Sequence, residues 1–445
     1  MFNKDSSLDI YLASAGTGKT TKLLDIIDKH LEEGVPIDRI AFVTFTKKGA
    51  EVAQLRTAER FGYPLDKLKN FRTIHSMAFR GGGASREIMM DYKKYKDFGE
   101  KAGYNFGNLG LNTTEGIDWS EMKDQQLVTI EQLYRNNRPY CEEIMEERVN
   151  YGDLARYMQL YVKYKNTFGY KDFTDLLEDY IAKGLGEDVD VVCLDEMQDS
   201  SLLQWQLVFQ AFRNARYVYV AADIKQAVFT YAGASPETVL RLRGTQHVME
   251  VSYRVPSAIL SYAQNIVDVM TLTDHSHCKA TKGGGKVEEI TSIEELDASF
   301  DINKSYFFLA RNKKFFKDYE EWCRKNALPY CIKGEPIFST TDKIEFREGR
   351  TEDWEPEKLD FARYCYSKGT FYMTPNINIS TIHTVKGDEA DIVVLMGDIS
   401  KAVASQLDLD EDSEHRVFYV AVTRAKEKLV IIQPQTRLYY PYIYQ

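Results

Sequence analysis

The beginning of the chain alternates short apolar runs with a segment of helical periodicity. Residues 8–12 form one apolar run, and residues 40–45 form another that is rich in β-branched and aromatic side chains. Between the two runs, apolar residues recur at helical spacing, at Leu23, Leu24, Ile26, Ile27 and Leu31. This pattern predicts a strand, a loop, a helix and a second strand, and such a connection implies a parallel sheet.

Further apolar runs have the length of buried strands, and they fall into two groups along the chain. The first group comprises residues 189–194 and 217–222, and the second comprises residues 306–310, 377–382, 392–396 and 428–432. Because these runs are short and are separated by helical patterns, they indicate an α/β chain with two sets of parallel strands.

Two stretches interrupt this alternation of strands and helices. Residues 81–170 begin with three glycines and continue as a polar segment rich in Tyr and Glu, which predicts a mainly helical insertion. Residues 316–375 contain Trp322, Trp354 and dense charges, and we expect a small insertion there. The predicted organisation is a first core of residues 1–80 and 171–250, the helical insertion of 81–170, a second core of 251–315 and 376–445, and the small insertion of 316–375.

The composition is that of a globular chain. The 445 residues are 44% apolar and 28% charged, and this length fits about three domains at ~150 residues each. No apolar run approaches the ~20 residues of a membrane-spanning helix, and the first residues, MFNKDSSLDI, lack the apolar segment of a signal peptide. We therefore expect a cytoplasmic protein with no membrane partner.

Charge and cysteine content narrow the chemistry further. The net charge of −10 has the wrong sign for a protein that coats nucleic acid through bulk electrostatics, but it does not exclude a local basic groove. The six cysteines include no Cys-x-x-Cys pair, so a cysteine-based zinc or iron-sulfur site is not supported. The cluster His275, His277 and Cys278 is the only hint of a metal site, and its polar surroundings favour a solvated loop.

The segment 13–20 fits a phosphate-binding loop. It reads Ala-Ser-Ala-Gly-Thr-Gly-Lys-Thr and lies between the predicted strand and helix, as such a loop does. Glycines let backbone N–H groups close around phosphates, and the start of the helix adds a partial positive charge. Lys19 can reach the β- and γ-phosphate oxygens, and Thr20 can ligate Mg²⁺. The residues expected to bind ATP here are Gly16, Thr17, Gly18, Lys19, Thr20 and Thr21.

Two adjacent carboxylates follow the predicted strand of residues 189–194. Asp195 and Glu196 end this apolar run, as the acids of a Walker B segment do. Asp195 is expected to hold Mg²⁺ directly or through water, together with Thr20, and Glu196 to polarise the attacking water. Alone, two acids after a strand are more often a solvated strand end, but the phosphate-binding loop favours the catalytic interpretation.

These residues resemble the motifs of a known family. Asp195-Glu196-Met197-Gln198-Asp199-Ser200 resembles the D-E-x-Q-D motif of superfamily 1 DNA helicases of the UvrD, PcrA and Rep type. The other motifs of that family occur in order along the chain, as Thr44-Phe45-Thr46, Thr73-Ile74-His75-Ser76, Phe173-Thr174-Asp175-Leu176-Leu177, residues 222–234, Ser252-Tyr253-Arg254, residues 381–389 and residues 416–425. The resemblance covers residues 8–433 apart from the two insertions.

The resemblance implies two RecA-like cores with ATP in the cleft between them and single-stranded DNA crossing both. It implies an ATP-dependent helicase or translocase that moves 3′ to 5′ along single-stranded DNA and unwinds duplex at single-strand/double-strand junctions. Carried onto this sequence, Gln226 senses the γ-phosphate, Tyr253 stacks on the adenine and Glu389 contacts the ribose. Arg254 and Arg424 are the implied arginine fingers, which stabilise the charge of phosphoryl transfer.

The same resemblance implies which residues contact DNA. Stacking and phosphate contacts suit any base sequence, so aromatic side chains are the strongest candidates. Core packing is an equally good interpretation of Phe45 and Phe229. The residues expected to contact DNA are Thr44, Phe45, Thr46, His75, Phe229, Tyr231 and His383.

Some positions depart from the family pattern. Tyr231 stands where the family has Trp, Ala232 replaces an Arg, and Ser252 replaces an Asn. The second insertion is also much shorter than the accessory domain of the family. This leaves two alternatives to a helicase: a translocase that displaces bound proteins with little unwinding, and a nucleotide-gated scaffold that binds DNA without turnover. The second is disfavoured because Lys19, Glu196, Arg254 and Arg424 are all present.

Overall fold

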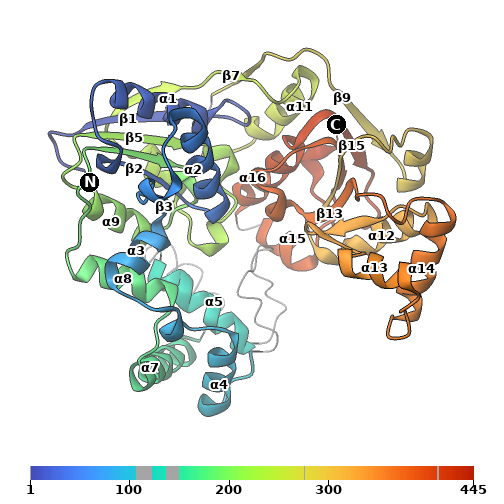
Figure 1. The fold of residues 1–445 in the computed structure, drawn as a ribbon, viewed down its shortest axis with the longest axis horizontal. Helices are drawn as coiled ribbons and strands as arrows, with labels where there is room; N and C mark the ends of the chain where they lie inside the picture. The colour runs from blue at the N-terminus through green and yellow to red at the C-terminus, as the bar shows by residue number, and fades with distance from the viewer. Residues whose placement is uncertain (1, 107–122, 137–149, 275, 408–409, 445) are drawn as a thin grey trace. The chain divides into compact units, whose positions relative to one another are not determined.

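The computed structural model describes residues 2–106, 123–136, 150–274, 276–407 and 410–444. The chain divides into two compact units, Met1–Glu250 and Val251–Gln445, and each contains a largely parallel β-sheet (Figure 1). The predicted α/β class with two parallel-sheet domains is therefore confirmed. Within the described ranges, no helix is both long enough and apolar enough to cross a membrane.

The sheet of the first unit has six parallel strands in the order β3-β2-β4-β5-β1-β6. They are β1 (Ser7–Leu12), β2 (Ile40–Thr44), β3 (Phe71–Thr73), β4 (Val191–Asp195), β5 (Tyr217–Ala222) and β6 (Thr245–Val248). The sequence pattern does not predict β3, which has three residues, or β6, which is polar and largely exposed. The register pairs Leu12 with Ala222 and Thr44 with Asp195, so the carboxyl ends of these strands share one edge.

Helices cover both faces of this sheet. On β2, Ala41 and Val43 face one hydrophobic core while Ile40 and Phe42 face another, as the two-residue period of a strand requires. The first core includes side chains of α3 (Ile74–Gly82), α8 (Phe173–Ala182), α9 (Leu202–Ala211) and α10 (Pro236–Leu240). The second includes side chains of α1 (Lys19–Glu32) and α2 (Lys47–Phe61).

Within the described residues between α3 and α8, the chain forms three α-helices. They are α4 (Tyr92–Ala102), α5 (Lys123–Asn136) and α7 (Tyr151–Phe168). These helices bury an aromatic core of their own, in which Phe98 packs against Tyr157 and Tyr161. The exact limits of a helical insertion at residues 81 and 170 stay a prediction.

The sheet of the second unit has seven strands in the order β12-β11-β13-β10-β14-β15-β9, and all neighbours are parallel except β11 and β12. Its strands are β9 (Lys286–Ile290), β10 (Tyr306–Ala310), β11 (Tyr330–Ile332), β12 (Glu335–Pro336), β13 (Ile377–Thr381), β14 (Ala390–Met396) and β15 (Ala425–Ile432). A separate pair is β7 (Val251–Ser252) with β8 (Lys279–Ala280). The helices are α11 (Ser257–Asp268), α12 (Phe316–Lys325), α13 (Thr340–Glu348), α14 (Pro356–Ser367), α15 (Lys401–Leu407) and α16 (Glu411–Val422).

The expected small insertion at 316–375 needs a correction. Strand β11 lies within this range and pairs with β13, so it is part of the sheet. Trp322 of α12 packs on Phe308 of β10 in the same hydrophobic core. The dense charges suggested an insertion, but they lie on exposed helix faces, as Lys317 does with 80% of its side chain exposed. At least the first part of this range therefore belongs to the second core.

Candidate functional site

The loop between β1 and α1 has the conformation of a phosphate cradle. Gly16 and Gly18 have φ angles of 75° and 80°, in the left-handed region that favours glycine. The Ala13 N–H donates to the Ala222 carbonyl at 2.9 Å, which ties the start of the loop to β5. The Thr17 hydroxyl donates to the Ser14 carbonyl at 2.9 Å. The start of a helix favours an anion because its dipole places positive potential there, and α1 begins directly after this loop.

Thr20 and Asp195 meet at the carboxyl ends of β1 and β4. The Thr20 Oγ1 hydroxyl donates to Asp195 Oδ2 at 2.7 Å, and Asp195 is 4% exposed. Burial and the neighbouring Glu196 raise the pKa of Asp195 to about 6, while Lys19 and the bond from Thr20 oppose the shift. A hydroxyl and a carboxylate oxygen are ligands that Mg²⁺ accepts, and Mg²⁺ at phosphate sites uses few protein ligands. The pair therefore fits a Mg²⁺ ion, although the described residues contain no larger His, Cys, Asp and Glu group suited to a metal.

Lys19 lies between two carboxylates from neighbouring strand ends. Its Nζ is 3.4 Å from Glu196 Oε1 and 3.9 Å from Asp223 Oδ2. Glu196 itself adopts the left-handed region, with φ 56° and ψ 36°, which is a strained conformation for a residue other than glycine. The Gln198 Nε2 group donates to Glu196 Oε2 at 2.5 Å. The structure therefore brings Lys19, Thr20, Asp195 and Glu196 into one site.

Gln226 reaches this site through Asp223. It ends the short turn that follows β5, and its Nε2 group donates to Asp223 Oδ2. The Asp223 N–H in turn donates to Gln198 Oε1 at 3.1 Å. Sequence analysis missed Gln198 and Asp223 as members of the site, although both lie within the segments that it matched to family motifs. Their role depends on side-chain bonds between two loops, which spacing does not show.

The second unit gathers the other residues predicted to contact nucleotide. Arg254 Nη2 donates to the Thr423 carbonyl at 3.4 Å, and Arg254 Nε is 3.7 Å from Glu389 Oε2. Arg424 is 1% exposed and donates to the carbonyls of Val420 at 3.0 Å and Asp388 at 3.3 Å. Tyr253 beside this cluster is 61% exposed.

Several predicted DNA contacts lie at the carboxyl end of β2. Thr44 is buried, while the exposed Thr46 caps α2 by accepting a bond from the Gly49 N–H at 3.0 Å. The rings of Phe45 and Phe229 stack with centroids 5.4 Å apart, and both rings are half-buried. This arrangement is compatible with both interpretations of the two phenylalanines. The side chain of Tyr231 and residue His275 lie outside the described part of the chain.

An exposed aromatic residue that the sequence analysis did not single out lies beside His75. The Phe173 ring is 59% exposed and meets the His75 ring edge to face, with centroids 5.6 Å apart. Burial lowers the pKa of His75 to about 4, so the ring is neutral at pH 7. A large exposed ring at the start of α8 is the signal that would have identified it, and only the structure shows the exposure.

His383 differs from its predicted role as a polar DNA contact. It is 3% exposed, and burial together with the charges of Arg311 and Lys386 lowers its pKa well below the ordinary value. Arg311 forms a buried two-bond pair with Glu414 of α16 through Nε and Nη2, at 2.7 and 2.8 Å. In this conformation His383 is therefore an interior side chain of the second unit.

Comparison with known proteins agrees with this geometry. Residues 7–247 match the model of the UvrD/REP helicase N-terminal domain, and residues 366–436 match the model of the UvrD-like helicase C-terminal domain. A probable DNA helicase of Mycoplasma pneumoniae is 25% identical over 96% of this chain and 81% of its own length. The ATP-dependent DNA helicase Rep of Escherichia coli is 23% identical over 76% of this chain.

The chain spans 54% of the length of Escherichia coli Rep and 50% of that of a probable DNA helicase II homologue of Mycoplasma genitalium, which is 22% identical. The match to the N-terminal domain model alone covers more than half of the chain. The chain therefore belongs to the UvrD/REP helicase family, a family of ATP-dependent DNA helicases.

Proposed function

We propose that this chain hydrolyses ATP at the carboxyl edge of the first sheet and uses each cycle to move 3′ to 5′ along single-stranded DNA, unwinding duplex at junctions. The observation that carries the ATPase proposal is the meeting of the two motifs. Thr20 bonds to Asp195 at 2.7 Å, and Lys19 lies 3.4 Å from Glu196, although the two segments are far apart in sequence. Direction and junction binding rest on the family resemblance.

The phosphates of ATP would bind where the loop N–H groups and Lys19 converge. Lys19 lies beside Glu196 and Asp223. Phosphate oxygens would attract the Lys19 ammonium away from these carboxylates, because they carry more negative charge in the same cradle. Thr20 and Asp195 would hold Mg²⁺, which when bound neutralises charge on the β- and γ-phosphates.

Glu196 is the candidate base of the reaction. If Lys19 moves to the phosphates, the Glu196 carboxylate can orient the attacking water and accept a proton from it. The bond from Gln198 holds the Glu196 carboxylate at its other oxygen. Gln226, bonded to Asp223, is the candidate sensor of the γ-phosphate because it lies on the same side-chain network.

The second unit would supply the remaining nucleotide contacts. Arg254 and Arg424 both bond to the Thr423 region, so the two guanidinium groups lie in one cluster. We assign them as the cations that stabilise charge on the transferring phosphoryl group. The exposed ring of Tyr253 is available to stack on adenine, and the exposed carboxylate of Glu389 can accept bonds from the ribose.

Single-stranded DNA would contact the first unit at two aromatic pairs. Phe45 pairs with Phe229, and His75 pairs with Phe173. Phe45, His75 and Phe229 lie on segments that follow strands of the sheet, whereas Phe173 begins α8. Base stacking on such rings contributes about 1 to 3 kcal/mol per base and is independent of sequence. Thr44, Thr46 and the segment containing Tyr231 complete the proposed path.

Two assays on DNA test the proposal beyond ATP hydrolysis. Strand displacement on substrates with a 3′ or a 5′ single-stranded tail measures unwinding and its direction. Displacement of streptavidin from biotinylated single strands measures movement without unwinding. We expect strand displacement only on duplex with a 3′ single-stranded tail. Strand displacement only on duplex with a 5′ tail would contradict the assigned direction.

A further inference from the structure

Two acids at the start of α8 have no place in the ATP site. Asp172 and Asp175 form a capping box at the start of α8, in which the N–H of each residue donates to the carboxylate of the other at 2.8 Å. A capping box needs only one acceptor oxygen from each side chain. The remaining oxygens of both acids face the helices α5 and α7.

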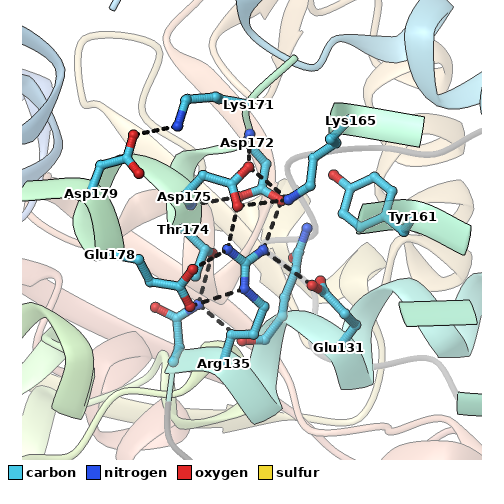
Figure 2. Close-up of polar contacts among 12 residues, drawn as sticks. Glu131, Arg135, Tyr161, Lys165, Lys171, Asp172, Thr174, Asp175, Glu178 and Asp179 are labelled. Atoms are coloured by element: carbon cyan, nitrogen blue, oxygen red, sulfur yellow. Dashed lines mark hydrogen bonds and ion pairs between the residues drawn. The ribbon is translucent and has the colours of Figure 1, made fainter. Parts of the chain in front are cut away.

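A cation from each of these helices binds the two acids. Arg135 of α5 donates to Asp172 Oδ2 at 2.9 Å and to Asp175 Oδ1 at 2.6 Å. Lys165 of α7 donates to the same carboxylates at 2.6 to 2.7 Å. Arg135 also donates to Glu131 and Glu178, so its guanidinium is bonded on every side. Figure 2 shows both cations converging on the acids of α8. We name Arg135, Lys165, Asp172, Asp175 and Glu178 the α8 clamp.

The α8 clamp is largely removed from solvent. The side chains of Lys165 and Arg135 are 4% and 11% exposed. Burial would raise the pKa of Asp172, but the charges of Lys165 and Arg135 outweigh it and hold the pKa below the ordinary value. Buried ion pairs add little net stability, whereas removal of one partner leaves an uncompensated charge. Such a cluster fixes geometry rather than supplying most of the folding free energy.

Helix α5 also contacts the loop between Glu196 and α9. Asn136, its last residue, donates from Nδ2 to Thr174 Oγ1 at 3.2 Å and accepts at Oδ1 a bond from the Ser201 hydroxyl at 3.1 Å. Ser201 caps α9 and forms an isolated bridge with Ala234. Helix α5 also lies against α9 and against Thr230–Ala232, the segment with the proposed DNA contact.

We propose that the α8 clamp and Asn136 are positioning elements that couple DNA binding to ATP hydrolysis, an inference that rests on the proposed function. Asn136 links α5 to the loop between Glu196 and α9, and α5 also contacts the segment beside Phe229. A shift of α5 on DNA binding would therefore move Ser201, and with it the loop that carries Glu196 and Gln198. Arg135 and Lys165 hold α5 and α7 on α8. A shift of α5 would therefore move Ser201 instead of only changing the packing of α5 against α8.

Steady-state ATPase assays with and without a single-stranded oligonucleotide test this proposal. The central variant is Asn136→Ala. It removes the bonds to Thr174 and Ser201, together with a bond to the Gln132 carbonyl of the same helix, and it leaves every ion pair of the clamp in place. We expect the DNA-stimulated kcat to fall by about fivefold or more. The DNA-free kcat should stay within about twofold, and the melting temperature within about 2 °C, because the side chain is only half-buried.

Arg135→Met and Arg135→Lys test the clamp itself. The first should lower DNA-stimulated kcat by about tenfold or more, and the second should restore part of it, because lysine keeps the charge but not the guanidinium fork. Arg156→Met is the matched control, since Arg156 is an exposed arginine of α7. If Arg135→Met does not fold, Asn136→Ala decides the question.

Unchanged DNA stimulation in Asn136→Ala would overturn the proposal, as would an equal loss in Arg156→Met. If the ATPase rate of the wild-type chain is the same with and without DNA, the proposed function is contradicted instead. The two failures are therefore distinguishable in one set of measurements.

Discussion

Glu196 occupies a left-handed backbone conformation, and this directs its carboxylate toward Lys19. If it is the base of the reaction, Glu196→Gln should lower kcat by about 10²-fold or more, since the amide keeps the size but cannot accept the proton. ATP affinity should hold, as measured by binding of a fluorescent ATP analogue. Glu59→Gln, an exposed carboxylate of α2, is the control. Hydrolysis at the wild-type rate in Glu196→Gln would remove this residue from the mechanism.

Arg424 is bonded to backbone carbonyls of its own unit, so its role as a finger requires that some of these bonds exchange for phosphate oxygens. Arg424→Ala should lower kcat by about 10³-fold while the KM for ATP stays within about threefold, because the finger acts mainly in the transition state. Rates must be taken per folded molecule, since the residue is buried. The exposed Arg437→Ala is the control. A raised KM with an unchanged kcat would make Arg424 a ground-state contact.

Single residues show where sequence analysis succeeds and where it stops. Lys19, Thr20, Asp195 and Glu196 were predicted together because each motif sets its own residues at the end of a strand, and parallel strands align those ends. The bonds of Arg424, and the burial of His383, depend on packing against α16 and on neighbouring charges. No local pattern encodes these contacts.

At the scale of elements, Phe173 at the start of α8 offers a clear test of the DNA path. Its ring is 59% exposed, so Phe173→Ala should leave the melting temperature nearly unchanged. Loss of base stacking should weaken single-strand binding by about tenfold, measured by fluorescence anisotropy. Phe168→Ala, a 46% exposed ring of α7, is the control. Equal affinity of the two variants would place Phe173 outside the path.

Glu131 makes the attachment of α5 dependent on pH. Burial and Asp172 raise its pKa to about 7, while Arg135 and Lys165 oppose the shift, and the Tyr95 and Tyr157 rings also lie nearby. The folded chain therefore holds a proton that the unfolded chain releases above its ordinary pKa of about 4.3. Stability from this group is complete below that value and is lost as the pH rises through 7.

Glu131→Gln removes this titration. The free energy of unfolding of the wild type should fall relative to that of the variant by up to about 3 kcal/mol between pH 5 and pH 8. Urea denaturation at each pH measures the difference. A gap between the two proteins that stays constant with pH would contradict the raised pKa.

The elements themselves were only partly predictable. Strands such as β5 and β10 match their predicted ranges because they are continuous apolar runs. Strand β11 was missed because it has three residues and follows a charged helix. The clamp could not be predicted from the sequence, because Arg135 and Asp172 are 37 positions apart and meet only through the packing of α5 on α8.

For the whole molecule, the residues proposed to act on ATP are divided between the two units. The first carries the phosphate cradle and the two acids, and the second carries Arg254, Arg424 and Tyr253. Each unit has its own sheet and core, so each can hold its residues in place independently. The proposed function therefore assigns residues of both units to one reaction.

The measurement that tests this account most directly is the steady-state ATPase rate of the wild-type chain with and without saturating single-stranded DNA, repeated with Lys19→Ala. We predict that DNA raises the ATPase rate of the wild-type chain by at least about tenfold. Lys19→Ala should lower the DNA-stimulated rate by about 10²-fold or more, because Lys19 is the only cation of the phosphate loop. DNA binding should survive the substitution. A rate that is the same with and without DNA, or that persists in Lys19→Ala, would contradict the central claim.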